Sequence, residues 1–588
     1  MFTGFPVPPN PITGLHSFDT RTEFGDFDLT ILPKNEMIRF NFGYSPERYS
    51  GPAFTTYHIG GNEFLLLSNL RSQANDYRFG ADGRLGRVDF SFQQGFRRFR
   101  DDSFINLGAT PGINPNPAVA SYTTFTRNEP TRGTVDYTTL SAHTLVASKL
   151  DITGRIVYSR GSSASIFREN ATGVNFNTRI SGQLAPPNTL LLGQYNIPAN
   201  VSRPNTIGDV GVTFLATNKF RISNTFRVED FQINGAATFN DFFSVQRGTT
   251  IDPRIFSNLG VLKSTMYRKY QDTVEGDYQF NKNYSIHFGY RYGTRRIEQI
   301  LNGYALNSNA PAVLKPIGDP TCLPPTVTCQ LDDIETNHTN IFFGGFKAQP
   351  VKGWTLYFDA EHGTADNVFT RIGNYNYTNI RAKSRYSPNR KVSLNLSLIT
   401  KDNSNPSEIA GVSLADFGVD VKSRAVSSSL DWMATDKVSV SMGYNYNWLN
   451  SDAVVDYFYQ TGTPLVSVRH PNGHSLYFVR NNFFFFDVTA QLHPRVALYA
   501  SYRINKDNGQ GSRLADPTGT PGTLINSYPM NFQTPEARLT IKLNRHIDWN
   551  LGYQYYDYTE SPLVGPRPQN YNAHLPYTSL RIYIGRRE

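Results

Sequence analysis

The sequence predicts an all-β protein, a large closed antiparallel transmembrane β-barrel of roughly 20–26 strands. Apolar and polar residues alternate with period 2 from about residue 37 to the end, no segment has helical periodicity, and short turns alternate with long polar connections. The composition agrees, because the 588 residues are 39% hydrophobic, 18% charged and 13% aromatic. A polar barrel interior lowers the hydrophobic fraction, and the many aromatics argue against disorder.

The period-2 alternation is clearest in five windows of the chain. They run from Ile38 to Tyr44, Tyr284 to Tyr292, Val392 to Leu398, Val438 to Tyr446 and Ile547 to Tyr555. Successive side chains of a strand point to opposite faces, so each window has one apolar and one polar face. In a membrane barrel the apolar face contacts lipid and the polar face lines the lumen.

The connections between these windows differ in length. Short ones lie at Asn281–Asn283, Ala434–Lys437 and Asn544–His546, whereas Asn302–Asp333 and Lys401–Gly418 are long and polar. Outer-membrane barrels have short periplasmic turns at one rim and long external loops at the other. The windows beside the short turns reach roughly 9–11 residues, enough to cross a bilayer at a steep tilt. We therefore expect a location in the bacterial outer membrane, in contact with its lipid.

Other architectures fit less well. A spanning helix needs about 20 consecutive apolar residues, and no such run occurs. A large soluble β-protein is the alternative, but a propeller would repeat one motif per blade, and we find none. Residues 1–36 lack sustained alternation and are predicted to form an extended N-terminal tail, too short for a folded plug domain, before a barrel of residues 37–588. Met1–Leu15 has no basic residue, so any export signal is expected to be missing from this sequence.

The two cysteines are Cys322 and Cys329, in the string TCLPPTVTC. Their close spacing in a Pro/Thr loop predicts a small local disulfide in an oxidising compartment, with two unpaired thiols as the alternative. No C-x-x-C-H motif occurs, so we expect no covalently bound haem and no other covalently bound cofactor.

Motifs for catalysis, metal binding or phosphate binding are weak. No G-x-S-x-G, H-E-x-x-H or P-loop string occurs, and we expect neither an enzyme nor a nucleic-acid partner. An enzymatic barrel stays an alternative, because catalytic residues need no local motif. His470 and His474 are the closest histidine pair, and we interpret them as polar loop residues, with a metal site as the alternative.

Basic residues are the more informative polar feature. Arg381, Lys383 and Arg385 alternate, so all three can point into the lumen, and Arg291 occupies a polar position of its window. The clusters Arg97–Arg100 and Arg295–Arg296 contain adjacent arginines, which predicts strand ends or rims. These residues either pair with acids across the wall or give a lumen that favours anionic groups.

Three segments resemble the MtrB/PioB family of outer-membrane barrels. They are NDYRFGADGRLGRVDFSFQQGFRRF (residues 75–99), HTLVASKLDITGRIVYSRG (residues 143–161) and YNAHLPYTSLRIYIG (residues 571–585). The resemblance implies a barrel that sheathes a multihaem c-type cytochrome, the haem being on that partner, for electron transfer across the outer membrane. The alternative function is a general or anion-favouring diffusion porin without a cytochrome partner.

Overall fold

The computed structural model describes most of the chain. The described residues are 19–59, 62–107, 121–176, 188–251, 255–307, 314–315, 328–366, 373–405, 418–461, 466–508, 511–515, 521–525, 529–560 and 570–583. No helix that could cross a membrane occurs among them. The predicted disulfide involves Cys322, which lies outside these residues, and therefore stays a prediction.

Every regular element in this part of the chain is a β-strand, so the all-β prediction is confirmed. The strands are β1 (Arg21–Phe24), β2 (Phe27–Ile31), β3 (Ile38–Ile59), β4 (Asn62–Leu85), β5 (Val88–Asp101), β6 (Phe104–Leu107), β7 (Ser121–Asn128), β8 (Thr131–Val146), β9 (Leu150–Phe176), β10 (Asn188–Leu215), β11 (Phe220–Arg247), β12 (Thr250–Ile251), β13 (Ile255–Asn281), β14 (Tyr284–Asn307), β15 (Leu314–Lys315), β16 (Thr328–Ala348), β17 (Trp354–Ala365), β18 (Asn376–Asn389), β19 (Val392–Asn405), β20 (Val419–Thr435), β21 (Val438–Thr461), β22 (Val466–His493), β23 (Val496–Asp507), β24 (Gly511–Ala515), β25 (Pro521–Ile525), β26 (Met530–Asn544), β27 (Ile547–Glu560) and β28 (Tyr571–Ile582).

The strands pair with their neighbours in antiparallel fashion, as in β3–β4, β8–β9 and β17–β18, and only the short β15–β16 pair is parallel among the described ladders. Five pairs of strands lie end to end, antiparallel, against one neighbour: β1 and β2 on β3, β5 and β6 on β4, β7 and β8 on β9, β12 and β13 on β11, and β23 and β24 on β22. Counting each of these pairs once reduces the 28 described strands to 23, within the predicted range. Closure of the strands into a barrel stays a prediction.

The predicted hairpin turns are present. β13 ends at Asn281 and β14 begins at Tyr284, and β20 and β21 are joined at Asp436–Lys437. Gly353, before β17, has a φ of +84°, and a Cβ added there would lie 2.1 Å from the backbone oxygen of Ser387. Only glycine fits this position, because it combines left-handed backbone with a close approach of another chain segment.

Several strands are longer than predicted. β10, β11 and β22 each have 28 residues, and β21 and β22 occupy most of a connection that its polar composition marks as a loop, including His470. The ladder of backbone hydrogen bonds continues beyond the apolar stretch, where periodicity of hydrophobicity no longer indicates it. Residues 21–31 of the predicted tail likewise form β1 and β2, which pair with β3.

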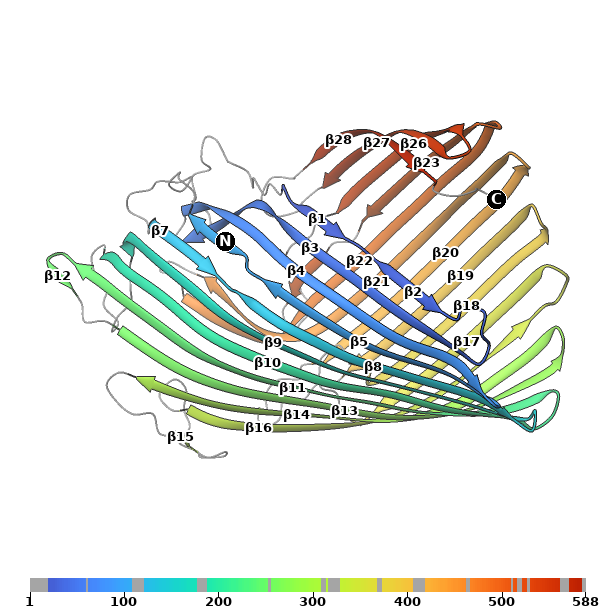
Figure 1. The fold of residues 1–588 in the computed structure, drawn as a ribbon, viewed down its shortest axis with the longest axis horizontal. Helices are drawn as coiled ribbons and strands as arrows, with labels where there is room; N and C mark the ends of the chain where they lie inside the picture. The colour runs from blue at the N-terminus through green and yellow to red at the C-terminus, as the bar shows by residue number, and fades with distance from the viewer. Residues whose placement is uncertain are drawn as a thin grey trace. The chain divides into compact units, whose positions relative to one another are not determined.

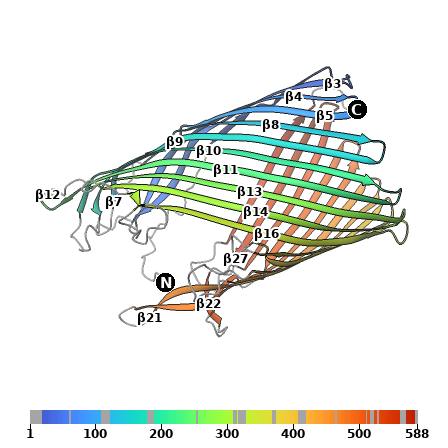
Figure 2. The same cartoon turned by 90° about the horizontal axis from the view of Figure 1, so that it is seen from below.

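The chain divides into two compact units. Unit 1 contains residues 1–213, 225–271 and 295–336, and unit 2 contains residues 214–224, 272–294 and 337–588. Within unit 1, β3, β4, β5, β8 and β9 run side by side in blue to cyan (Figure 1). Within unit 2, β17 to β22 form an equally regular series in yellow to orange (Figure 1). Figure 2 shows β8, β9 and β10 of unit 1 from below as long ribbons that lie side by side.

Each unit has one apolar face, which we define from the strand register. In unit 1 it carries the cross-strand rows Phe42–Phe79 and Tyr77–Phe96, and in unit 2 the row Leu398–Val426. These side chains are 38–44% exposed. So many exposed large apolar side chains indicate contact with lipid.

The opposite, polar face of each unit carries charged side chains that pair with one another. In unit 1, for example, Arg84 pairs with Asp89 at 2.6 Å and Arg155 with Asp209 at 2.9 Å. A compact buried core is small and local, comprising Leu66, Phe125, Ala171, Leu190 and Val245 of unit 1. This distribution is typical of a membrane barrel, whose apolar side chains face outward.

Candidate functional site

The polar face of unit 2 carries a concentration of basic side chains. Register places Lys347 opposite Tyr357, which in turn lies opposite Lys383. Arg381 and Arg385 flank Lys383 on the same face of β18, and Lys401 of β19 lies opposite Asn379. We call the five side chains of Lys347, Arg381, Lys383, Arg385 and Lys401 the basic patch.

The basic patch has few acidic neighbours. Arg381 lies opposite Asp359, but Asp359 is engaged by His287, whose Nε2 is 3.2 Å from its Oδ1. Arg381, Lys383 and Arg385 are exposed, and the part of unit 2 that the structure describes supplies no ion pair to any of them. Same-face neighbours on one strand are roughly 6.6 Å apart, so their positive potentials add and favour anionic groups.

Two hollows adjoin the patch. One of about 330 Å³ is lined by Arg381, Lys401, His287 and Glu361, and one of about 440 Å³ by Lys383 and Arg385 together with Ser427 and Asn445. Hydroxyl and amide groups beside the cations supply hydrogen-bond donors for oxygen-rich groups such as carboxylates and phosphates. The geometry therefore suits anion binding.

Arg291 differs from the other three sequence-predicted basic residues. Its Nη1 lies 3.4 Å from Oε2 of Glu361, and its guanidinium lies 5.2 Å from the ring centroid of Phe343. The hydroxyl of Tyr377 donates a second hydrogen bond to Glu361 at 2.8 Å. Arg291 is therefore paired with an acid across the wall, which is one of the two predicted alternatives, whereas Arg381, Lys383 and Arg385 retain uncompensated charge.

Two members of the basic patch were not predicted from the sequence. Lys347 and Lys401 stand at the polar phase of the alternating runs FFGGFKA and LNLSLITK, so a signal was present. Each is a single lysine near a strand end, and only the register of β16 to β19 brings them beside Arg381 and Lys383.

The remaining sequence candidates lie elsewhere. The prediction that adjacent arginines lie at strand ends holds for one cluster: Arg97 pairs with Glu47 at 3.8 Å on the polar face, while Arg98 shares a face with Phe96 near the end of β5. It is wrong for Arg295 and Arg296, which lie in the middle of β14, because the strand continues well past the apolar stretch. His474 contacts Asp452 at 2.8 Å, and no group of three potential metal ligands occurs among the described side chains. The side chain of His470 lies outside the described part of the structure, so the interpretation of this pair stays a prediction.

Comparisons with known proteins support the architecture. Neither a family model nor a curated protein matches the chain. Among solved structures, the ferric yersiniabactin uptake receptor FyuA from Yersinia pestis has a TM-score of 0.50 at 10% identity, covering 96% of this chain and 78% of that one. The siderophore receptor PiuA from Acinetobacter baumannii has a TM-score of 0.48 at 9% identity, covering 96% and 79%. The copper transporter OprC has a TM-score of 0.48 at 11% identity, covering 95% and 78%.

The likeness to FyuA shows the fold. The chain has the fold of an outer-membrane β-barrel, which confirms the predicted fold class and agrees with the predicted location in the bacterial outer membrane. At 10% identity the likeness carries no ligand from FyuA to this chain.

Proposed function

We propose that this chain is a non-enzymatic outer-membrane β-barrel whose lumen presents the basic patch to an anionic occupant, and that this occupant is a multihaem c-type cytochrome. The observation that carries the proposal is the uncompensated charge of Arg381, Lys383 and Arg385 on the polar face. The resemblance of three segments to the MtrB/PioB family supplies the identity of the occupant.

The chemistry of such a partner fits the patch. Haem propionates are carboxylates, and complementary potentials across an interface steer association and set its register. The chain contributes positioning: arginine and lysine donors bind carboxylates, and neighbouring serine and asparagine side chains fill the remaining hydrogen bonds. The apolar face keeps the assembly in lipid. All haem would be attached to the partner, because this chain has no C-x-x-C-H motif.

A second candidate function is an anion-favouring diffusion pore. It is favoured by the exposure of the three charged side chains of β18, which leaves them accessible to small solutes as well as to a protein. Charged rings that line a pore select permeating ions by sign. The two candidates differ in whether the lumen is filled.

Charge reversal tests the basic patch for both candidates. The variant R381E/K383E changes the charge of the patch by four, and the matched control R390E/K391E makes the same change at the turn between β18 and β19. If the barrel encloses a cytochrome, we expect R381E/K383E to reduce the haem that co-purifies from native membranes at least tenfold. The control R390E/K391E should co-purify with as much haem as the wild type.

The pore makes a different prediction with the same variants. The refolded wild-type barrel would conduct anions in planar bilayers, and R381E/K383E would shift its reversal potential toward cation selectivity. Equal behaviour of both variants in both assays would refute a role for the patch.

A further inference from the structure

The apolar face of unit 1 ends in a cluster of arginines at the end of the strands opposite the short turns. On β5, Phe92 and Phe96 are followed on the same face by Arg98 and Arg100, and β5 ends at Asp101. Register extends one row from Arg48 of β3 through Gln73 and Arg100 to Arg132 of β8. We call Arg48, Arg71, Arg98, Arg100 and Arg132 the arginine cluster.

The cluster is strongly unbalanced in charge. Its nearest acid is Asp102, whose Oδ1 lies 3.0 Å from Nη2 of Arg132 and whose Oδ2 lies 4.0 Å from Nε of Arg100. Asp136 and Arg160 stand opposite each other in the row of Tyr77 and Phe96, two rows from Arg100 and Arg132 on the same face. Arg100 and Arg132 remain 48% and 60% exposed, although like charges directly opposite on neighbouring strands repel.

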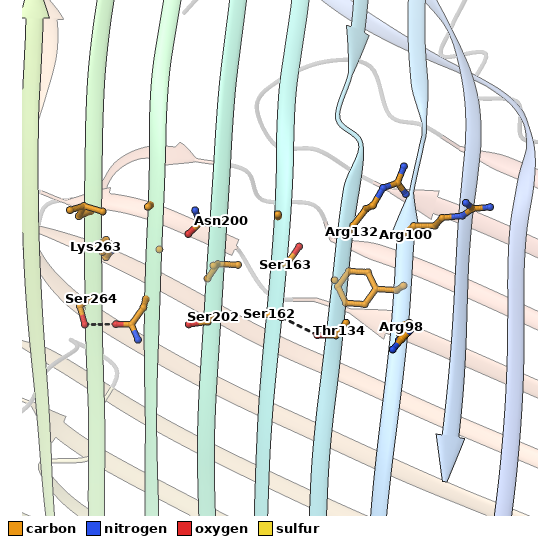
Figure 3. Close-up of a pocket in the computed structure, with 18 of the residues that line it drawn as sticks. Arg98, Arg100, Arg132, Thr134, Ser162, Ser163, Asn200, Ser202, Lys263 and Ser264 are labelled. Atoms are coloured by element: carbon orange, nitrogen blue, oxygen red, sulfur yellow. Dashed lines mark hydrogen bonds between the residues drawn. The ribbon is translucent and has the colours of Figure 1, made fainter.

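A band of polar side chains continues from the cluster across the neighbouring strands. Figure 3 shows Arg98, Arg100 and Arg132 on adjacent strands beside Thr134 and Ser162, whose hydroxyls are 3.0 Å apart. The hollow that these side chains line has a volume of about 1190 Å³ and extends to Ser264, whose hydroxyl donates to Asn234 at 2.9 Å. Hydroxyl and amide groups of this kind bind the hydroxyls of sugars.

Three kinds of side chain thus lie next to one another on a single face of unit 1: aromatic side chains, arginines, and side chains with hydroxyl or amide groups. The aromatic part contacts acyl chains in the membrane. Arginine binds phosphate oxygens through two parallel hydrogen bonds, and basic sites next to the acyl region bind anionic headgroups. The short turns mark the periplasmic rim, so the cluster lies at the level of the outer leaflet.

We propose that this surface binds the phosphorylated glycolipid of the outer leaflet, with its phosphates on the arginine cluster and its sugars on the polar band. The inference rests on the outer-membrane location and is independent of what occupies the lumen. It concerns the lipid-facing side of unit 1, whereas the basic patch lies on the polar face of unit 2.

The test uses the full chain refolded in detergent and diphosphoryl lipid A as the probe, with bound lipid counted by native mass spectrometry. R98Q/R100Q is expected to bind the probe roughly tenfold more weakly than wild type, because charge-assisted hydrogen bonds are lost. The matched control R39Q/R97Q removes two exposed arginines from the polar face of β3 and β5 and is expected to bind normally.

Additional measurements distinguish lipid binding by the arginine cluster from misfolding of the variant and from binding of phosphate alone. D102N removes the acid beside Arg132 and is expected to bind several-fold more tightly, a gain that a misfolded barrel would not show. Dephosphorylated lipid A should bind wild type and R98Q/R100Q equally weakly. The proposal would be overturned by unchanged binding in R98Q/R100Q, by an equal loss in R39Q/R97Q, or by displacement of the lipid by millimolar inorganic phosphate.

Discussion

The assignment of faces can be tested with two adjacent serines of β20. Ser428 lies in the row Leu396–Ser428–Tyr444 on the apolar face, and Ser427 lies between Ser397 and Asn445 on the polar face. S428R and S427R introduce the same side chain one residue apart. Only the direction in which the arginine points differs between them.

The structure gives the expected magnitude. The apolar rows of β20 are bordered by Trp432 on one side and by the pair Arg424–Trp448 on the other, eight residues apart along β20. Eight residues span about 26 Å along the strand, or roughly 20 Å across the membrane at a tilt of about 40°. Ser428 lies midway, so S428R places a charge near the midplane, at a cost of about 2–4 kcal/mol.

The measurement is equilibrium unfolding in urea of each variant folded into lipid vesicles. We expect S428R to lower the free energy of unfolding by about 2–4 kcal/mol, and S427R to change it by less than about 0.5 kcal/mol, because a polar-face arginine stays in water. If S427R is the more damaging variant, or if the two are equal, the assignment of the faces is wrong.

Three further predictions concern local stability, each measured by the same unfolding experiment. F125A empties a site that is 1% exposed within the core of unit 1 and should cost about 3–5 kcal/mol; a loss below about 1 kcal/mol would show that this core is not packed. E361Q weakens the contact with Arg291 at 3.4 Å and should lower the free energy of unfolding by about 1 kcal/mol, since both side chains remain partly exposed. An unchanged free energy of unfolding would show that this ion pair does not stabilise the protein. G353A should destabilise more than G86A, because both positions have positive φ but only the former brings a Cβ to 2.1 Å of another backbone; the reverse order would contradict the turn geometry.

The strand architecture was accessible from the sequence because it depends on local patterns. Alternation in Val392–Leu398 and the turn at Asn281–Asn283 each specify their own structure, and both are confirmed. The extension of β21 and β22 into polar sequence was not accessible, since there the ladder is held by backbone hydrogen bonds that hydrophobic periodicity does not report.

The candidate sites required the register as well. Alternation was enough to place Arg381, Lys383 and Arg385 on one face, but the partner of Arg291 is Glu361, 70 residues away in the chain. The arginine cluster shows the same limit, because Arg48 and Arg132 belong to one row only through the pairing of four strands. Long-range pairing decides which charges are compensated, and single-strand patterns contain no information on it.

We propose that the lumen holds an anionic, haem-carrying partner. The most direct measurement is absorbance in the haem Soret region of the protein purified from native membranes, together with planar-bilayer conductance of the same sample. The proposed function predicts stoichiometric haem that stays with the barrel and a silent bilayer. Large steady conductance without haem absorbance would contradict the sheath and identify an open pore.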